Sequence, residues 1–480
     1  MAKAREIVKF NDLPLELLAN ILGHLVRPHH LTLACRVDKT FYTFGIQFLY
    51  VWVHIASWHK NPKYRVVQLF ETLNSNPKLA SYVRKLEIRD FPRVPLPGAV
   101  DAVLGGISNC INLVSCTWTR DGTLSTMILE ELQKLPNLAE LEINGHCKEF
   151  RYYDPEVLTG FCRLKKIGLI MPEPSLVNGK LERWIVATNH GLVHLNLICK
   201  SSPLITDEIL ESIAPYLDHL ETLSLTGCTH ITHTGVFSVL SQNRSGIRSL
   251  ALEGISSKFE MSQFAALCSS SNCLDELRSI TLTVQEDPTF QTTAITKYKP
   301  VNYFEHLRTL LARTSLTHFQ IYASQIYYDV SASNSFFRDL ISVHGKRLKR
   351  FSIHRMMIGL DVIKEICESC EELEQLFLVV MHSDLTNLAP CLSPAQKLRV
   401  VHLNHPQRLQ TSLSSIFLPS DALKIVKHLS PHVVQFGCNA KVWQVGSKVT
   451  VLDNGEMVSE RVLLPYESLE VPEAFLVVRT

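Results

Sequence analysis

The sequence lacks the features that mark several large classes of protein. Among its 480 residues, no apolar run approaches the roughly 18–20 residues of a membrane-spanning helix. The formal net charge is only +2, so charge gives no reason to expect nucleic acid or a membrane as a partner. The start of the chain has no apolar core of a signal peptide, and the 13 cysteines are scattered and odd in number. We therefore expect reduced thiols and a cytoplasmic or nuclear location.

Sequence motifs of catalysis and cofactor binding are missing as well. The chain has 20 histidines, yet none lies in the His-Glu-x-x-His pattern of zinc proteases, and no nucleophile elbow or glycine-rich phosphate loop is present. Cys367 and Cys370 form its one Cys-x-x-Cys pair, whereas a structural zinc site usually needs two such pairs. The two cysteines lie one helical turn apart, near the apolar positions Ile363 and Ile366, which favours a structural role. We predict a protein that is not an enzyme and that holds no metal or cofactor.

What the sequence does have is a repeat. Hydrophobic residues make up 46% of the chain, and 480 residues exceed what one compact core usually holds. The pattern apolar-x-x-apolar-x-apolar recurs, mostly at intervals of 25 to 32 residues, with longer intervals of 39 after Leu277 and 35 after Leu398. The hexads are VRKLEI (from Val83), LVSCTW (Leu113), LAELEI (Leu138), LKKIGL (Leu164), LVHLNL (Leu192), LETLSL (Leu220), IRSLAL (Ile247), LRSITL (Leu277), LTHFQI (Leu316), LKRFSI (Leu348), LEQLFL (Leu373), LRVVHL (Leu398) and VVQFGC (Val433).

Each hexad ends in an apolar-polar alternation, which predicts a short strand with one buried face. The intervals carry helical patterns such as TDEILESIAPYL, with Ile209, Ile213 and Leu217 on one stripe. This α/β succession resembles a leucine-rich repeat solenoid, which implies parallel strands on a concave face and helices on a convex face. The segment LSLTGCTHITHTGV is similar to the cysteine-containing subclass of these repeats, and the resemblance implies that Cys228 and Ile231 face the interior.

The N-terminal segment Leu13 to Tyr42 carries two apolar helical stripes but is too short for a domain with its own core. We expect Pro28 to end the first helix, and surplus apolar surface suggests a docking site for a partner. LPLELLANILGHL, LTLACRVDKTFY and LYVWVHI together resemble the F-box. The resemblance implies that the three helices bind a Skp-family adaptor through Leu13, Pro14, Leu17, Leu18, Ile21, Leu25, Val37 and Phe41. The alternative is an ordinary helical cap on the solenoid.

The following segment, FETLNSNPKLASYVRKLEI, looks like the junction between F-box and repeats in fungal F-box proteins. We expect an F-box at 1–58, a linker helix at 59–82, repeats at 83–445 and a C-terminal hairpin or tail cap at 446–480. The resemblance implies a substrate-recognition subunit of a Skp–cullin–F-box ubiquitin ligase, which reaches cullin and RING subunits through the adaptor and binds a protein substrate of unknown identity. The rival interpretation is a leucine-rich repeat interaction scaffold that acts outside any ligase.

The hexads also predict where a substrate binds. The third and fifth residues of each hexad, and the residue that directly follows it, face away from the helices. The late repeats place aromatic and arginine side chains there, the usual anchors of interfaces. The predicted substrate surface comprises Tyr322, Arg350, His354, Phe377 and His402. One alternative is that loops or the tail of the chain itself cover Phe377, and the charged early repeats are the next candidate surface. VTVLDNGEMVSERVLL predicts a β-hairpin around Asp453–Gly455, either as an end cap or as part of a substrate-touching tail.

Overall fold

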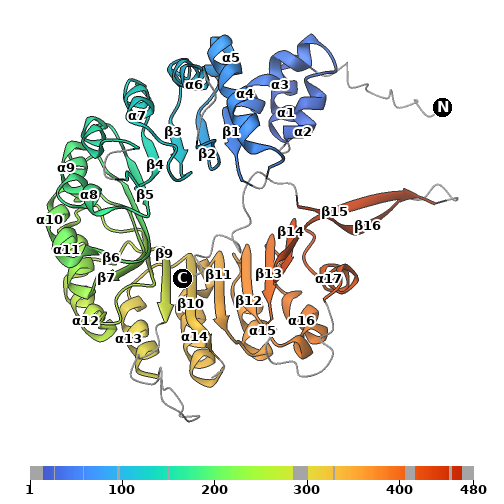
Figure 1. Ribbon diagram of the computed structural model, residues 1–480. Coiled ribbons are helices and arrows are strands. Elements are labelled where there is room, and N and C mark those ends of the chain that lie inside the picture. The colour runs from blue at the N-terminus through green and yellow to red at the C-terminus, as the bar shows by residue number, and fades with distance from the viewer. Residues whose placement is uncertain are drawn as a thin grey trace. The chain divides into compact units, whose positions relative to one another are not determined.

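The computed structural model describes residues 14–25, 28–57, 59–93, 98–148, 152–284, 301–327, 330–405, 417–452 and 457–466. The chain divides into two compact units, one ending at Gly191 and the other beginning at Leu192. Strands and helices alternate in both units (Figure 1).

The first unit begins with three helices and continues as strand–helix repeats. Its elements are α1 (Leu15–Gly23), α2 (Pro28–Ala34), α3 (Lys39–Val51), β1 (Trp52–Ile55), α4 (Pro62–Ser75), α5 (Pro77–Ala80), β2 (Lys85–Ile88), α6 (Ala99–Ser108), β3 (Ser115–Trp118), α7 (Thr126–Gln133), β4 (Glu140–Asn144), the 3-10 helix η2 (Pro155–Gly160), β5 (Lys166–Ile170), α8 (Pro174–Val177) and α9 (Lys180–Ala187).

Strands β1 to β5 pair in chain order, and all these pairs are parallel. The register places the buried residues Val53, Leu86, Cys116, Leu141 and Ile167 side by side across the sheet. Four of them are the fourth residue of a hexad, so the repeat in sequence is a repeat of register. The sheet nevertheless starts at β1, earlier in the chain than the hexads predict.

The second unit continues the same alternation and ends in a pair of long strands. Its elements are β6 (His194–Thr206), α10 (Asp207–Ile213), η3 (Ala214–Tyr216), β7 (Thr222–His230), α11 (His233–Gln242), β8 (Ser249–Glu253), α12 (Met261–Ser271), β9 (Ser279–Val284), α13 (Val301–Leu311), β10 (His318–Tyr327), α14 (Val330–His344), η5 (Gly345–Arg347), β11 (Arg350–Met356), α15 (Leu360–Ser369), β12 (Gln375–Val379), η6 (His382–Asp384), α16 (Leu385–Leu392), β13 (Val400–Asn404), α17 (Pro419–Val426), β14 (Gln435–Cys438), β15 (Lys441–Val451) and β16 (Met457–Pro465).

Strands β6 to β14 pair in parallel, each with the next along the chain. Every hexad of the sequence pattern overlaps one strand from β2 to β14, so the predicted repeat of parallel strands and helices is confirmed. The architecture resembles that of leucine-rich repeat proteins. Between the strands and helices of this unit, Phe304, Phe319, Phe336, Phe337 and Phe351 form an aromatic core, with the rings of Phe304 and Phe336 stacked at 5.0 Å.

Two positions, one inside β7 and one at the start of α2, show how the local sequence fixes the backbone. Gly227 has φ +67°, and a Cβ there would collide with the carbonyl oxygen of Cys199, so only glycine fits. The following Cys228 and Ile231 are fully buried, in the interior position that their resemblance implied. Pro28 differs from expectation, because α1 already ends at Gly23 and Pro28 opens α2. Proline suits the first turn of a helix, where its missing N–H costs no hydrogen bond.

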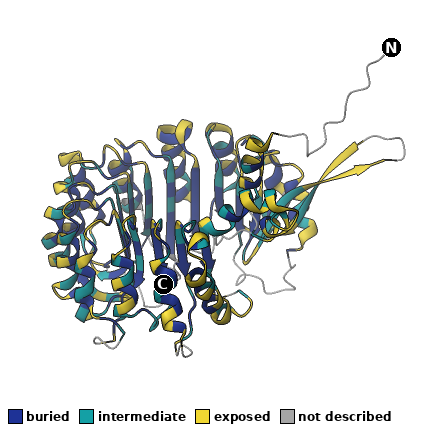
Figure 2. Ribbon diagram, turned by 90° about the horizontal axis from the view of Figure 1, so that it is seen from above, coloured by how far each residue is buried: buried dark blue, intermediate teal, exposed yellow. Residues whose placement is uncertain are grey.

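The last two strands, β15 and β16, form an antiparallel ribbon that continues the sheet beyond β14. The predicted turn at Asp453–Gly455 lies outside the described residues. The Arg461 guanidinium fixes the base of the ribbon by donating to the carbonyl oxygens of Val426 (2.8 Å) and Ser430 (2.6 Å), at the end of α17. The far end projects from the unit with exposed side chains such as Val451 and Met457 (Figure 2).

Across the part of the chain that the structure describes, no helix is long and apolar enough to span a membrane.

Candidate functional site

Helices α1 to α3 form a small module packed around an apolar cluster, although the segment Leu13 to Tyr42 alone was expected to be too short for a core of its own. Leu18, Leu22 and Leu31 are buried at its centre. The partly buried side chains around this centre are Leu25, Ala34, Phe41, Phe44, Phe48 and Leu49. Helix α3 begins at a cap, where the Asp38 carboxylate accepts the backbone N–H of Phe41 at 2.8 Å.

The same module leaves apolar side chains in solvent. Leu17 (44% exposed) and Ile21 (37%) lie one turn apart on α1, and Val37 (63%) lies between α2 and α3. Pro14 is exposed just before α1. Sequence reasoning missed Leu15, Leu33 and Tyr42, which are also exposed. Large apolar side chains that a small module leaves uncovered are typical of a protein-binding surface.

These positions divide the predicted adaptor-binding residues into two groups. Pro14, Leu17, Ile21 and Val37 are accessible to a partner, as the prediction requires. Leu18 is not, because it is only 6% exposed and lies at the centre of the module core. Leu25 and Phe41 pack against that core and are partly buried. Leu13 lies outside the described residues. Leu18 therefore belongs to the core of the module and not to its accessible surface, whereas Leu17 and Ile21 of the same predicted set remain exposed.

In the second unit, the predicted substrate residues do come together. The rings of Tyr322 on β10 and His354 on β11 stack at 4.8 Å, and those of Phe377 on β12 and His402 on β13 stack at 6.0 Å. His354 joins the two pairs, with its ring centroid 6.1 Å from that of Phe377. The Arg350 guanidinium lies 5.1 Å from the centroid of Phe377. We call these five residues the ring ladder.

Neighbouring polar groups hold the ladder in place. Ser352 Oγ lies 2.8 Å from His354 Nε2, and the Arg350 guanidinium donates to the side-chain oxygen of Gln320. His402 Nε2 lies 3.1 Å from the carbonyl oxygen of Asn439, beyond β14. A Cβ at Gly437 would collide with the His402 ring, so glycine on β14 makes room for the imidazole. The sequence analysis did not predict that position 437 must be glycine. The only indication in the sequence was a glycine inside a hexad.

The ring ladder is desolvated, and this controls its ionisation. Burial lowers the pKa of His402 to about 4, so the imidazole is neutral at pH 7. Burial also lowers the pKa of His354, and the positive charge of Arg350 lowers it further, to about 3. On β8, which is separated from β10 by β9, burial raises the pKa of Glu253 to about 7, although a hydrogen bond with Tyr322 opposes the rise.

The side chains of the ring ladder are less accessible than the prediction required. The prediction required accessible side chains, yet all five residues are buried, Phe377 at 1% exposed and His402 at 0%. Their orientation is as predicted, since flanking residues such as Leu376 and Leu378 belong to the helix-facing core. The alternation of the hexads thus predicts correctly that these side chains point away from the helices, but it does not predict whether they are accessible to solvent. The ring ladder is buried in this structure.

In the first unit, the same strand positions carry charge. Burial alone would raise the pKa of Glu87 on β2, but hydrogen bonds from His54 and Lys85 outweigh it and lower the pKa to about 2. Lys85 Nζ lies 2.8 Å and His54 Nδ1 3.3 Å from this carboxylate. Arg89 lies 3.4 Å from it and 3.8 Å from Glu142 on β4. Charges of both signs therefore lie on β2, directly after it and on β4.

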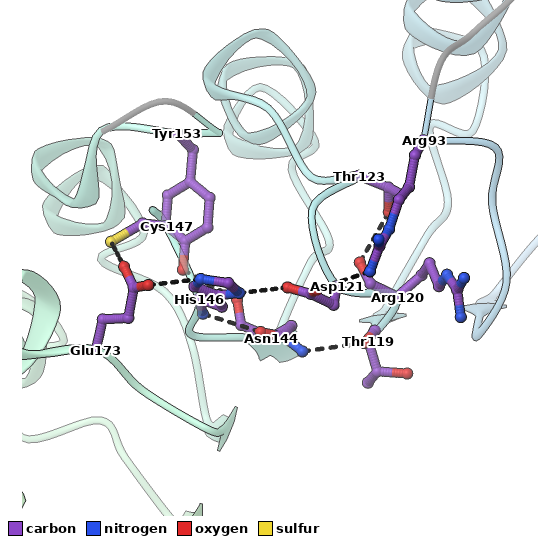
Figure 3. A network of polar contacts seen from close by, with 10 residues as sticks. All are labelled: Arg93, Thr119, Arg120, Asp121, Thr123, Asn144, His146, Cys147, Tyr153 and Glu173. Atoms are coloured by element: carbon purple, nitrogen blue, oxygen red, sulfur yellow. Dashed lines mark hydrogen bonds and ion pairs between the residues drawn. The ribbon is translucent and has the colours of Figure 1, made fainter. Parts of the chain in front are cut away.

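A second polar network joins the loops that follow β2 to β5 (Figure 3). Arg93 Nη2 donates to Asp121 Oδ2 at 3.0 Å, and the other oxygen of this carboxylate lies 2.5 Å from His146 Nδ1. His146 Nε2 lies 2.6 Å from Glu173 Oε1, and Cys147 donates to Glu173 Oε2 at 3.3 Å. Because each link joins a different repeat, the network fixes the spacing of these loops. Arg93, Asp121 and His146 remain 36–62% exposed at the side chain, so this surface is accessible.

The structure gives the cysteines a packing role. Cys367 and Cys370 are buried and unbonded, and burial raises the pKa of Cys370 to about 12. A thiol held protonated in this way is a weak nucleophile and a weak metal ligand. Within the described ranges, no three His, Cys, Asp or Glu side chains are arranged to hold a metal ion.

Comparison with known proteins adds distant structural likenesses. No family model matches the chain, and a search of curated proteins gives no match. Among solved structures, the chain is similar to the yeast complex of Rad7 and Elc1, with 14% identity, a TM-score of 0.41 and coverage of 67% of this chain and 83% of the other. It is also similar to the leucine-rich repeat-containing protein LegL7 from Legionella pneumophila, with 12% identity, a TM-score of 0.39 and coverage of 63% and 93%. Similarity of this degree does not assign a function.

Proposed function

We propose that the chain is a non-enzymatic substrate-recognition subunit of a Skp–cullin–F-box ubiquitin ligase, working in the cytosol or nucleus. The α1–α3 module docks a Skp-family adaptor, which links it to cullin and RING subunits, and the repeats hold a protein substrate. Ubiquitin transfer takes place on the other subunits. The contribution of this chain is to bring the substrate close and orient it.

The observation that carries the proposal is the apolar surface of the module. Leu18 and Leu22 already fill its core, so Leu17, Ile21 and Val37 are not needed inside and are left in solvent. Apolar side chains of this size cost free energy in water, and a partner that covers them recovers it. The F-box resemblance of the same segment supports a Skp-family adaptor as that partner.

Charge reversal of this surface tests the docking. The variant Leu17→Asp with Ile21→Asp places two carboxylates where the adaptor would remove water. Because a lost interface anchor costs at least about 2 kcal/mol, adaptor affinity should fall at least about 30-fold. The readout is pull-down of a Skp-family adaptor by the full chain. Ile111→Asp is the matched control, an exposed isoleucine of the same unit outside the module. Equal capture of the adaptor by both variants would refute the docking surface.

An interaction scaffold outside any ligase is the rival function, and the same pull-down separates the two. The ligase role requires that cullin co-purifies with the chain and the adaptor, in amounts that fall with the Leu17→Asp and Ile21→Asp variant. Recovery of the adaptor without cullin would favour the scaffold.

The substrate surface that we propose is the ring ladder. Because its five side chains are buried, a substrate can bind there only when these side chains become accessible. A combined Tyr322→Ala, Arg350→Ala and His402→Ala variant should lose captured substrates yet still bind the adaptor, with circular dichroism as the folding control. The exposed network around Arg93 is the competing surface, tested by Arg93→Glu. Loss of partners from Arg93→Glu, with retention by the triple variant, would move the substrate site to the first unit.

A further inference from the structure

A cavity lies between the helices of two late repeats. Within the part of the chain that the structure describes, its wall is built from η6, from the neighbouring helices α16 and α17 (Figure 1) and from the residues beside them. The volume of the cavity is about 680 Å³. Pockets that bind small organic molecules have volumes of about 300–1,000 Å³. The cavity is therefore large enough for a small ligand.

The wall of the cavity is mainly apolar. Helix α16 contributes Leu385 and Ala389, which lie about one helical turn apart and so share a face. Helix α17 contributes Ile425, and Phe417 adds an aromatic ring two residues before this helix. A ligand that fills this space leaves water over most of its surface, so most of that surface should be apolar.

The polar side chains of the wall supply mainly hydrogen-bond donors. Lys424 carries an ammonium group, and the imidazoles of His382 and His428 each have at least one N–H in either tautomer. Among the described residues of the wall, Asp421 alone has a carboxylate. This carboxylate already accepts the backbone N–H of Leu418 and the Lys424 ammonium, both at 3.2 Å, and these hydrogen bonds lower its pKa. A ligand that pairs with the remaining donors should therefore carry an anionic group.

Contacts outside the cavity hold part of its wall in place. The rings of His382 and His405 meet edge to face with their centroids 5.4 Å apart, and the His405 ring lies 6.4 Å from that of Phe417. His405 is itself held by Asn439, whose Nδ2 lies 3.0 Å from His405 Nδ1. Because these side chains are positioned before a ligand arrives, binding has less conformational entropy to lose.

We propose that the cavity between α16 and α17 binds a small apolar carboxylate. The apolar part of the ligand lies against Leu385, Ala389 and Phe417, and its carboxylate faces Lys424 and the two imidazoles. The site is independent of the adaptor docking proposed above, because its residues belong to the second unit, whereas α1 to α3 belong to the first.

Calorimetric titration of the full chain tests the class of ligand. The probe is dodecanoate, an apolar chain that ends in a carboxylate, and we expect one molecule to bind per chain with a Kd below about 100 μM. Dodecyltrimethylammonium has the same chain and a cationic end, so it should bind at least about three-fold more weakly. No binding of dodecanoate, or equal affinity for the two probes, would overturn the proposal.

Substitutions test the location of the site. Ala389→Trp fills the cavity with an indole ring and should weaken dodecanoate binding at least about ten-fold, because part of the chain then stays in water. Lys424→Glu should weaken it at least about three-fold by placing a second carboxylate beside the anion. Lys427→Glu is the matched control, since it makes the same charge change at an exposed lysine directly after α17 that does not line the cavity.

Thermal melting followed by circular dichroism shows whether each variant is folded. Full retention of binding by folded Ala389→Trp or by Lys424→Glu would refute the assigned location. So would an equal loss of binding in Lys427→Glu and Lys424→Glu.

Hydrogen exchange locates the ligand without any substitution. Saturating dodecanoate should slow the exchange of α16 and α17 amides about two-fold or more, because the ligand binds only the folded form of these helices. The amides of α12, in the same unit, should exchange at an unchanged rate. No slowing in α16 and α17, or equal slowing in α12, would contradict the proposal.

Discussion

The buried imidazole of His402 should make the stability of the second unit depend on pH. In the folded chain, burial lowers its pKa from 6.5 to about 4, whereas in the unfolded chain it returns to the ordinary value. As the pH falls below 6.5, the unfolded state therefore binds a proton at His402, whereas the folded state stays unprotonated there until the pH approaches 4. The contribution of His402 is complete above about pH 7 and decreases as the pH falls through 6.5 towards 4, where it levels off.

The size of the effect follows from the two pKa values. One unit of pKa corresponds to 1.36 kcal/mol, so lowering the pH from 7.5 to 5 should remove about 2 kcal/mol of stability through His402 alone. His354 and His344, whose pKa values are also lowered by burial, act in the same direction. Removing one histidine should therefore reduce the pH dependence without abolishing it.

The assay is urea unfolding of the full chain and of His402→Gln at a series of pH values between 5 and 7.5. Glutamine keeps a polar side chain but cannot be protonated, so the loss of stability over this range should be about 2 kcal/mol smaller in the variant. His428→Gln is the matched control, because it replaces an exposed histidine of the same unit. If the unaltered chain and His402→Gln lose equal stability between pH 7.5 and pH 5, the imidazole is not desolvated as described.

Three further substitutions test the packing. Leu18→Ala should destabilise the α1–α3 module by about 2–5 kcal/mol, whereas Leu17→Ala should cost far less, and hydrogen exchange of the α1 amides separates them. Gly227→Ala should destabilise the second unit by on the order of 2–3 kcal/mol, because alanine is strained at φ +67° and its Cβ would collide with the Cys199 carbonyl oxygen. Equal urea unfolding midpoints for this variant and the unaltered chain would contradict that expectation. Arg461→Ala should speed proteolysis of the β15–β16 ribbon several-fold, because it removes hydrogen bonds from a charged group to the end of α17 that contribute about 1.5–3 kcal/mol. Lys448→Ala on the same ribbon is the control.

The sequence was most informative where one physical rule acts in every repeat. A strand with one face buried must alternate, and stacked repeats must share a register, so the hexads located strands β2 to β14. β1 was missed because its residues, Trp52 to Ile55, belong to a segment that also matches the N-terminal helical module. Pro28 was misplaced because proline is compatible both with the end of one helix and with the first turn of the next.

The candidate site was predicted in part for similar reasons. Leu17 and Leu18 belong to one apolar stripe on α1, and only the position of α2 and α3 decides which of them enters the core. The ladder residues were correctly assigned to one face, since alternation fixes direction. Their burial was not predicted, because strand alternation fixes the face to which a side chain points but not how much of that face is accessible to solvent.

The most direct test of the account is calorimetric titration of the purified full chain with a purified Skp-family adaptor. An interface built on the exposed face of α1–α3 should give one adaptor per chain with a Kd below about 1 μM. The Leu17→Asp and Ile21→Asp variant should raise that Kd at least about 30-fold, while Ile111→Asp leaves it unchanged. Absence of binding by the unaltered chain, or binding that the Leu17→Asp and Ile21→Asp variant retains in full, would contradict the central claim.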